Sequence, residues 1–245
     1  MSFRDREDAA RRLAEELRAC KGEDPLVLAI PRGALPMGAI LAEALDGELD
    51  VVLVHKLGAP YNPEHAIGAV AETGEVVMSD APDVAAVPRS YVERETERQL
   101  AILRARRDRY TPGRPAAGPR DRVVIVVDDG IATGSTLKAA LQVVRAQRPR
   151  ELIAAVAVAP AESLASIEPL ADQVVCLEMP PSFFAVGTLF DGFRQVGNDE
   201  VAEVLSAAAR RRARREERRA KQEPGRSARA EPAGVAAPAA GAARR

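Results

Sequence analysis

The residues with the clearest chemical potential are two adjacent carboxylates, Asp128 and Asp129. They follow a run of β-branched apolar residues at 123–127, which predicts a buried strand of a parallel sheet. Neighbouring carboxylates at the end of such a strand are costly to ionise unless ligand hydroxyls or a metal ion contact both of them. The pair therefore indicates a site for a ligand that carries hydroxyl groups.

Small and hydroxyl-bearing residues follow within a few positions, as Thr133-Gly134-Ser135-Thr136. Residues 137–145 have helical composition, so a helix is expected to begin at this turn and to direct backbone N–H groups toward it. Such a turn suits a phosphate group, and the whole stretch predicts a site for a sugar phosphate. The alternative is structural, with the acids and hydroxyls serving only as N-caps of the helix.

Residues 124–136 resemble the phosphoribosyl-pyrophosphate (PRPP) signature of type I phosphoribosyltransferases: four apolar residues, two acids, a short variable stretch and Thr-Gly-Ser-Thr. The resemblance implies that Asp128 and Asp129 hold the ribose hydroxyls. It also implies Mg²⁺ bound with PRPP, which the two acids would contact only indirectly, through PRPP hydroxyls or water. The same resemblance assigns the 5-phosphate to the loop that follows: Gly130, Ile131, Ala132, Thr133, Gly134, Ser135 and Thr136.

Strand and helix patterns alternate along the rest of the chain. Apolar runs predict strands at 26–30, 51–55, 123–127, 152–159 and 174–177 and a hairpin at 67–71 and 75–78. Helical spacing and composition predict helices at 5–20, 35–45, 89–109, 137–145 and 161–170, with a Pro/Gly-rich linker at 111–119. This order predicts a three-layer α/β/α fold with a mainly parallel sheet, similar to that of the phosphoribosyltransferases.

The turn Pro31-Arg32-Gly33 follows the first predicted strand. The resemblance implies that this strand neighbours strand 123–127, where ligands of such sheets bind. Arg32 then becomes a pyrophosphate ligand and Gly33 permits close backbone approach. Arg32 and Lys56, which follows the predicted strand 51–55, are the cations expected to help the diphosphate leave. Asp128 and Asp129 are the other expected catalytic residues. An ordinary tight turn is the simpler alternative.

Residues 55–65 read as a long polar connection that contains two prolines and both histidines, His55 and His65. Long connections are often lids, and Lys56 would be the cation of this one. For the histidines, a solvated or packed position is the simpler interpretation. The sequence contains no Ser–His–Asp order, Gly-x-Ser-x-Gly elbow, metal-spaced histidine cluster or Walker loop, so hydrolase and metalloenzyme functions find little support.

The acceptor side of the site is less defined. Relatives that act on 6-oxopurines commonly have an acid just before the Thr-Gly of the loop, where this chain has Ala132, which argues against hypoxanthine or guanine. The resemblance predicts a small hood around residues 178–209 together with the N-terminal helix. Its aromatic residues could stack on a base or form a small core of their own: Phe183, Phe184, Phe190 and Phe193.

The net charge of −1 hides an uneven distribution, because residues 210–245 carry twelve basic and four acidic residues. This tail should extend a helix that begins near Asp199 and then become disordered, which leaves residues 1–209 as the phosphoribosyltransferase-like domain. A solvated extension without a specific role is the simpler interpretation, and a weak electrostatic arm for nucleic acid is the alternative. Cys20 and Cys176 suit core packing.

Two functions remain open from the sequence. The first is a phosphoribosyltransferase that moves the 5-phosphoribosyl group of PRPP to an unidentified, nitrogenous acceptor and releases pyrophosphate. The second is a non-catalytic regulator of the same fold that senses PRPP or a nucleotide and binds nucleic acid. We expect a cytoplasmic protein without membrane contact, because no apolar stretch reaches transmembrane length and the N-terminus is charged. We also expect a homodimer.

Overall fold

The computed structural model describes residues 2–79, 81, 84 and 86–222. The chain forms two compact units, residues 1–210 and 211–245. The tail predicted at 210–245 continues the last helix as far as Gln222, as expected for its beginning, and its remainder, residues 223–245, lies outside the described part of the chain. No helix among the described residues is long and apolar enough to cross a membrane.

A five-stranded parallel sheet forms the centre of the first unit, in the order β2-β1-β6-β7-β8. Its strands are β1 (Leu26–Ala29), β2 (Glu48–Val51), β6 (Val123–Asp128), β7 (Glu151–Val158) and β8 (Gln173–Glu178). The chain passes from β1 outward to β2 and from β6 outward to β7, so the strand order reverses between β1 and β6. Ligands of parallel sheets bind at the carboxyl edge of such a reversal.

Helices cover both faces of this sheet and confirm the predicted three-layer fold. Val123, Ile125 and Val127 of β6 pack in one core with α1 (Arg6–Glu16), α2 (Leu35–Ala44) and the beginning of α6 (Asn198–Gln222). Val124 and Val126, which point to the opposite face, pack with α4 (Ser135–Ala146). The alternation of side chains along a strand explains why an uninterrupted apolar run serves two cores.

Short helical elements complete the α/β alternation. They are η1 (Arg18–Cys20), α5 (Ala161–Ala165), η3 (Glu168–Leu170) and η4 (Val186–Leu189). The helix predicted at 161–170 is thus divided into α5 and η3. Asp5 is the N-cap of α1, where its side chain accepts a hydrogen bond from the Asp8 amide, and acids occupy the first turn.

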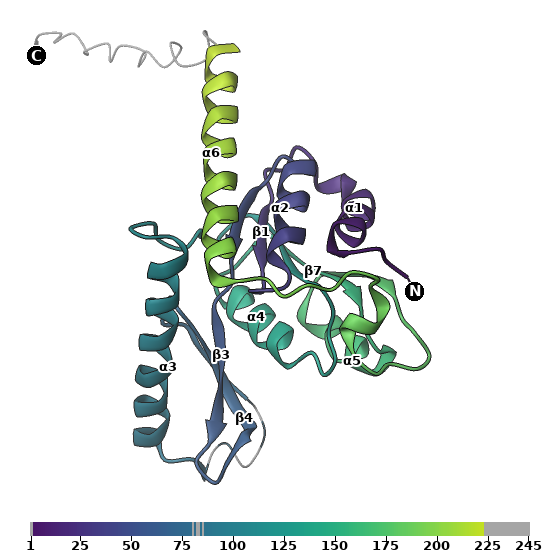
Figure 1. Ribbon diagram of the computed structural model, residues 1–245. Coiled ribbons are helices and arrows are strands. Elements are labelled where there is room, and N and C mark those ends of the chain that lie inside the picture. Colours follow the sequence, from purple (N-terminus) through teal and green to yellow (C-terminus); the bar gives the residue numbers. More distant parts are fainter. Residues whose placement is uncertain (1, 80, 82–83, 85, 223–245) are drawn as a thin grey trace, which may run out of the picture. The chain divides into compact units, whose positions relative to one another are not determined.

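A second sheet is antiparallel and contains β3 (Val54–Ala59), β4 (Asn62–Ala71) and β5 (Val76–Met78). It lies beside the long helix α3 (Arg89–Tyr110), as Figure 1 shows. The predicted hairpin at 67–71 and 75–78 is confirmed. The strand predicted at 51–55 is wrong, because β2 ends at Val51. The long connection predicted at 55–65 is wrong as well, because those residues form the β3–β4 hairpin with its turn at Pro60 and Tyr61.

A buried group of charges joins this second sheet to the first. Arg107 of α3 donates to Asp50 of β2 at 2.6 Å and to the backbone oxygen of Val51 at 3.0 Å, and it also pairs with Glu72 at the end of β4. The three charged side chains are at most 8% exposed. Burial raises the pKa of Glu72, although Arg107 opposes the rise. Removing one member of such a group leaves an unpaired buried charge, so the contacts fix α3 against the central sheet.

Candidate functional site

The two halves of the predicted site meet at the edge between β1 and β6. The Ile30 amide donates to the Val127 carbonyl at 3.0 Å and aligns the ends of the two strands. Gly33 lies so close to Asp129 that a Cβ at position 33 would come within 2.2 Å of the Asp129 Oδ2. Only glycine fits there without moving the carboxylate. The peptide bond between Pro31 and Arg32 in this turn is cis.

Asp128 ends β6 beside Asp129 and is partly buried. Burial and the neighbouring negative charge of Asp129 raise the pKa of Asp128 well above its ordinary value. The Asp129 amide donates to the Asp128 Oδ1 at 2.9 Å and partly offsets that rise. A carboxyl group in this state gains from any ligand that brings hydroxyl donors or a compensating charge.

Asp129 is paired with a cation that no sequence pattern indicated. The Nε and Nη2 of Arg6, in α1, each lie 2.7 Å from the Asp129 Oδ2, and both residues are buried. The Nη1 of Arg6 donates to the Arg194 carbonyl at 2.6 Å, and the guanidinium stacks 3.8 Å from the ring centre of Phe193. Arg6 thereby links the N-terminal helix, the acidic pair and the segment around residue 193.

The loop after the acidic pair exposes Thr133, Ser135 and Thr136, which lead directly into α4. Gly134 is the N-cap of α4, adopts a left-handed backbone with φ of 71°, and supplies no capping side chain. No acid occupies the first turn of the helix, and the Ser135 amide makes only a long contact of 3.4 Å with the Thr133 hydroxyl. The N-cap position of α4 is thus occupied by a glycine and not by an acid or a hydroxyl residue, and the capping interpretation is supported only by the long Thr133 contact. The amides at the start of α4 keep their capacity to bind an anion.

Neighbouring segments hold this loop in place. The Ile131 amide donates to the Val158 carbonyl at 3.0 Å, and the Ser163 hydroxyl donates to the Ala132 carbonyl at 2.5 Å. A Cβ at Gly130 would come within 2.6 Å of the side chains of Val158 and Val186. Gly130 thus permits η4, which contains Val186, to pack directly behind the loop.

The four phenylalanines proposed for the acceptor pocket do not form a single group. Phe190 is buried and its ring lies 5.2 Å from those of both Phe3 and Phe193, so this part of the segment is a small core. Phe183 packs partly buried against the main core, and Phe184 is 88% exposed. Phe193 is linked to the acidic pair through Arg6, which contacts both its ring and Asp129.

The N-terminal segment and residues 189–192 form the hood side of this region. The Phe3 amide donates to the Leu189 carbonyl at 3.1 Å, and the Asp191 amide donates to the Phe3 carbonyl at 3.0 Å. A cavity of about 360 Å³ lies beside Arg6, Phe193, Arg194 and Pro36. Pro36 is in the first turn of α2, so this cavity adjoins the turn that carries Gly33.

The two predicted leaving-group cations occupy different places. Arg32 is exposed and lines a cavity of about 530 Å³ with Arg106, Arg109 and Tyr110 of α3 and with Asn198. Lys56 lies within β3, paired with Ala69 of β4, and is not among the residues that line this cavity. The second cation next to Arg32 therefore comes from α3, a position that no pattern in the sequence indicates.

Among the described residues, no group of three or more histidines, cysteines or carboxylates is arranged to hold a metal ion. The acidic pair offers two carboxylates, one of them bound to Arg6. Magnesium prefers oxygen ligands, and several of them are usually water molecules or phosphate oxygens of the substrate and not protein atoms. The pair fits magnesium only as an indirect contact, with a bound ligand providing most of the oxygens.

The arrangement is that of the phosphoribosyl transferase domain family, and residues 3–190 match the model of this family. The chain belongs to it. Two Mycobacterium tuberculosis proteins, from strains CDC 1551 and H37Rv, carry provisional phosphoribosyl transferase names and are each 41% identical over 212 residues, which is 85% of this chain. The chain spans about half, 47%, of the length of these curated relatives.

A solved structure is also similar to this chain. TT1426 from Thermus thermophilus is 45% identical and has a TM-score of 0.77, with 84% of this chain and 98% of that chain covered. The agreement supports the fold of the chain over the part that is covered.

Proposed function

We propose that this chain is a phosphoribosyltransferase that moves the 5-phosphoribosyl group of PRPP to a nitrogenous acceptor and releases pyrophosphate. The observation that carries the proposal is the junction of three features at one sheet edge. The carboxylates of Asp128 and Asp129, the uncapped start of α4 and the Gly33 turn all lie where β1 and β6 end. These features match the hydroxyls, the 5-phosphate and the diphosphate of PRPP.

Each group has a defined part in the reaction. The ribose hydroxyls donate to Asp128 and Asp129, and the amides and hydroxyls of residues 131–136 hold the 5-phosphate. The bond from the ribose C1 to the diphosphate oxygen breaks with its electron pair, and C1 gains oxocarbenium character like the sugar in glycoside hydrolysis. The acceptor nitrogen then forms the new bond to C1 and releases its proton to solvent. Arg32 neutralises the departing diphosphate.

Magnesium, bound mainly by PRPP oxygens, would supply further positive charge for the diphosphate. The acidic pair would support it only through PRPP hydroxyls or water. This expectation rests on the chemistry of the two carboxylates and on the pairing of Asp129 with Arg6.

One observation also favours the second function, a non-catalytic regulator that senses PRPP or a nucleotide. Arg6 contacts the Oδ2 of Asp129, so a ribose hydroxyl that approaches this oxygen competes with the guanidinium. A protein that binds PRPP or a nucleotide to change its own state, without transfer, would use such a competition directly. A homodimer, and an interaction of the basic tail with nucleic acid, remain predictions for either function.

Calorimetry with PRPP and Mg²⁺ tests the binding site. We expect Asp128→Asn and Asp129→Asn each to lose a charge-assisted hydrogen bond of about 1.5–3 kcal/mol. The matched control is Arg145→Ala. Arg145 is on α4, its ion pair with Asp172 is exposed, and its loss should leave the PRPP affinity unchanged. Unchanged PRPP affinity in the double aspartate variant would refute the assignment.

A screen of bases and small amines with PRPP, read by pyrophosphate release, separates the two functions. Release with one acceptor supports the transferase, and its loss in Arg32→Ala supports the leaving-group role. PRPP binding without release, together with salt-sensitive RNA binding that is lost when residues 211–245 are deleted, supports the regulator. Deletion of 211–245 should leave PRPP binding intact in both cases.

A further inference from the structure

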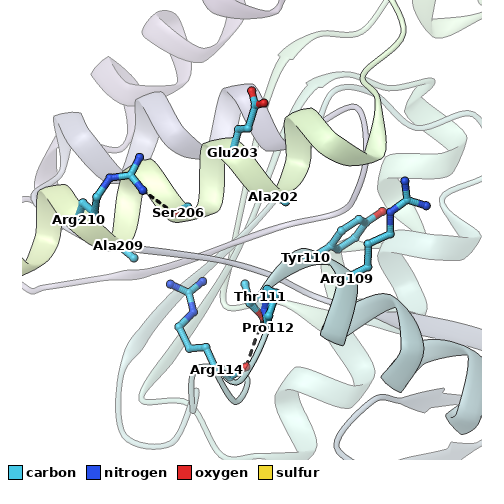
Figure 2. A pocket seen from close by; sticks show the side chains of 10 residues that line it. All are labelled: Arg109, Tyr110, Thr111, Pro112, Arg114, Ala202, Glu203, Ser206, Ala209 and Arg210. Atoms are coloured by element: carbon cyan, nitrogen blue, oxygen red, sulfur yellow. Dashed lines mark hydrogen bonds between the residues drawn. The ribbon is translucent and has the colours of Figure 1, made fainter.

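A cavity of about 560 Å³ lies outside the site described above, between the C-terminal end of α3 and the first half of α6. Figure 2 shows its wall. One side is the segment from Arg109 to Arg114, and the other is α6 from residue 202 to residue 210. All of these residues belong to the first compact unit.

The wall of this cavity carries an excess of positive charge. Arg109, Arg114 and Arg210 line it, and the only acid among its described lining residues is Glu203. In Figure 2 the Glu203 carboxylate points away from Arg114, although Glu203 also lines the cavity, so one negative charge stands against three arginines. Arg109 pairs with Asp199 at 3.0 Å, but both side chains are more than half exposed, so this contact is weak.

Arg114 contributes a charge to this wall that its neighbours neutralise only in part, and its side chain is 37% exposed. Its Nη2 is buried and has no hydrogen-bond partner among the described residues. The nearest carboxylate oxygen, on Asp50, is 3.8 Å away. Asp50 already accepts hydrogen bonds from Arg107 and from the amides of Val51 and Ala117. Because Asp50 is shared among these donors, the Arg114 guanidinium keeps capacity to bind an anion through its exposed part.

The remaining wall is apolar and small. Pro112, Ala202 and Ala209 line the cavity together with Tyr110. The volume is in the range of sites for small molecules, where a mostly apolar wall and a few polar groups hold one ligand. Guanidinium groups bind phosphate oxygens through paired hydrogen bonds, and an apolar wall suits the flat face of a base.

The cavity also adjoins the turn that carries Arg32. Arg109 and Tyr110 line both this cavity and the one that contains Arg32. The Tyr110 hydroxyl bonds to Asn198 at 2.9 Å, and Asn198 lines the Arg32 cavity. A ligand that draws Arg109 toward one cavity therefore removes charge from the other.

We propose that the cavity between α3 and α6 is a second binding site, for a nucleoside phosphate. Arg114 and Arg210 hold the phosphates, and the base lies against Ala202, Ala209 and Pro112. Because Arg109 is shared, occupation of this site changes the affinity of the Arg32 cavity for anions, and the reverse change is equal in size. The assignment of this site does not depend on the transferase function.

Calorimetry with ADP on the full chain tests the proposal. Arg114→Ala should weaken ADP binding about tenfold or more, because one charged phosphate contact is lost. Ala209→Leu keeps every charge and a helix-favouring residue but fills the apolar wall, so it should weaken ADP more than inorganic pyrophosphate. Arg94→Ala, an exposed arginine of α3 outside this cavity, is the matched control and should bind ADP like the unaltered chain.

Asp128→Asn separates this site from the one at the acidic pair, and ADP should bind that variant with unchanged affinity. The proposal is overturned if ADP fails to bind at millimolar concentration. It is also overturned if Arg114→Ala and Ala209→Leu bind ADP like Arg94→Ala, or if Asp128→Asn abolishes binding. In that last case ADP occupies only the first site, and the failure leaves the PRPP assignment standing.

Discussion

The pairing of Arg6 with Asp129 makes a strong prediction about stability. Arg6→Ala leaves the Asp129 carboxylate, 9% exposed, without its partner and next to Asp128. Breaking one side of a buried pair costs about 3–5 kcal/mol, and the stacking of the guanidinium on Phe193 adds about 0.5–2 kcal/mol. Water that enters the adjoining cavity recovers part of this loss. We therefore expect a decrease of about 3 kcal/mol in the free energy of unfolding.

Urea denaturation followed by circular dichroism measures this change. Arg11→Ala is the matched control, because Arg11 lies on the same helix and pairs with Glu7 at 2.8 Å, with both side chains more than half exposed. We expect its effect to stay below about 1 kcal/mol. The double variant Arg6→Ala with Asp129→Asn should recover part of the stability, because it contains no unpaired carboxylate at position 129.

The reasoning is refuted if Arg6→Ala destabilises the chain no more than Arg11→Ala does. It is refuted equally if Asp129→Asn brings no recovery in the Arg6→Ala background. The first result would mean that solvent screens the pair as it screens a surface contact, and the second that Arg6 stabilises the fold only through Phe193 and the Arg194 carbonyl.

The same region and the buried charges lead to three further predictions. The raised pKa of Asp128 makes the folded state bind more protons than the unfolded state above pH 3.8, so this group's contribution to stability falls as pH rises through the raised pKa. Asp128→Asn should therefore have a higher melting temperature than the unaltered chain at pH 8, and the advantage should shrink toward pH 4. Gly33→Ala should weaken PRPP binding about tenfold or more by displacing Asp129, measured by calorimetry against Gly118→Ala, whose added Cβ meets nothing within 4 Å. Arg107→Met should cost about 3–5 kcal/mol in urea denaturation, and a cost below about 1 kcal/mol would show that the buried pairs do not fix α3.

Local patterns predicted much of the fold. The run that forms β6 and the hydroxyl turn before α4 carry their own signals, because a buried parallel strand and a helix start each require particular residue types in sequence. The neighbouring position of β1, implied by the family resemblance, is confirmed by its pairing with β6. The hairpin of β3 and β4 was missed because its two prolines and its polar residues resemble a loop. Among its residues with described burial, Leu57, Ala59, Ile67 and residues 69–71 are buried, and the others are partly or fully exposed.

The missed parts of the candidate site depend on contacts between distant residues. Arg6 and Asp129 are 123 positions apart, and a single arginine in an amphipathic helix has no pattern that identifies its partner. Arg106 and Arg109 are two of many arginines on α3, and only the fold places them beside Arg32. Phe184 is exposed and Phe190 is buried, and this difference likewise depends on packing, because both are phenylalanines of the same short segment.

The pairing of Phe3 with residues 189–191 has a practical consequence for anyone who prepares this protein. Phe3 is 1% exposed, and its backbone is hydrogen-bonded on both sides only three residues before Arg6. A purification tag fused ahead of Ser2 would join the chain next to this paired segment, on the helix side that carries Arg6. An uncleaved N-terminal tag should therefore disturb ligand measurements, so binding data taken before and after its removal need to be compared.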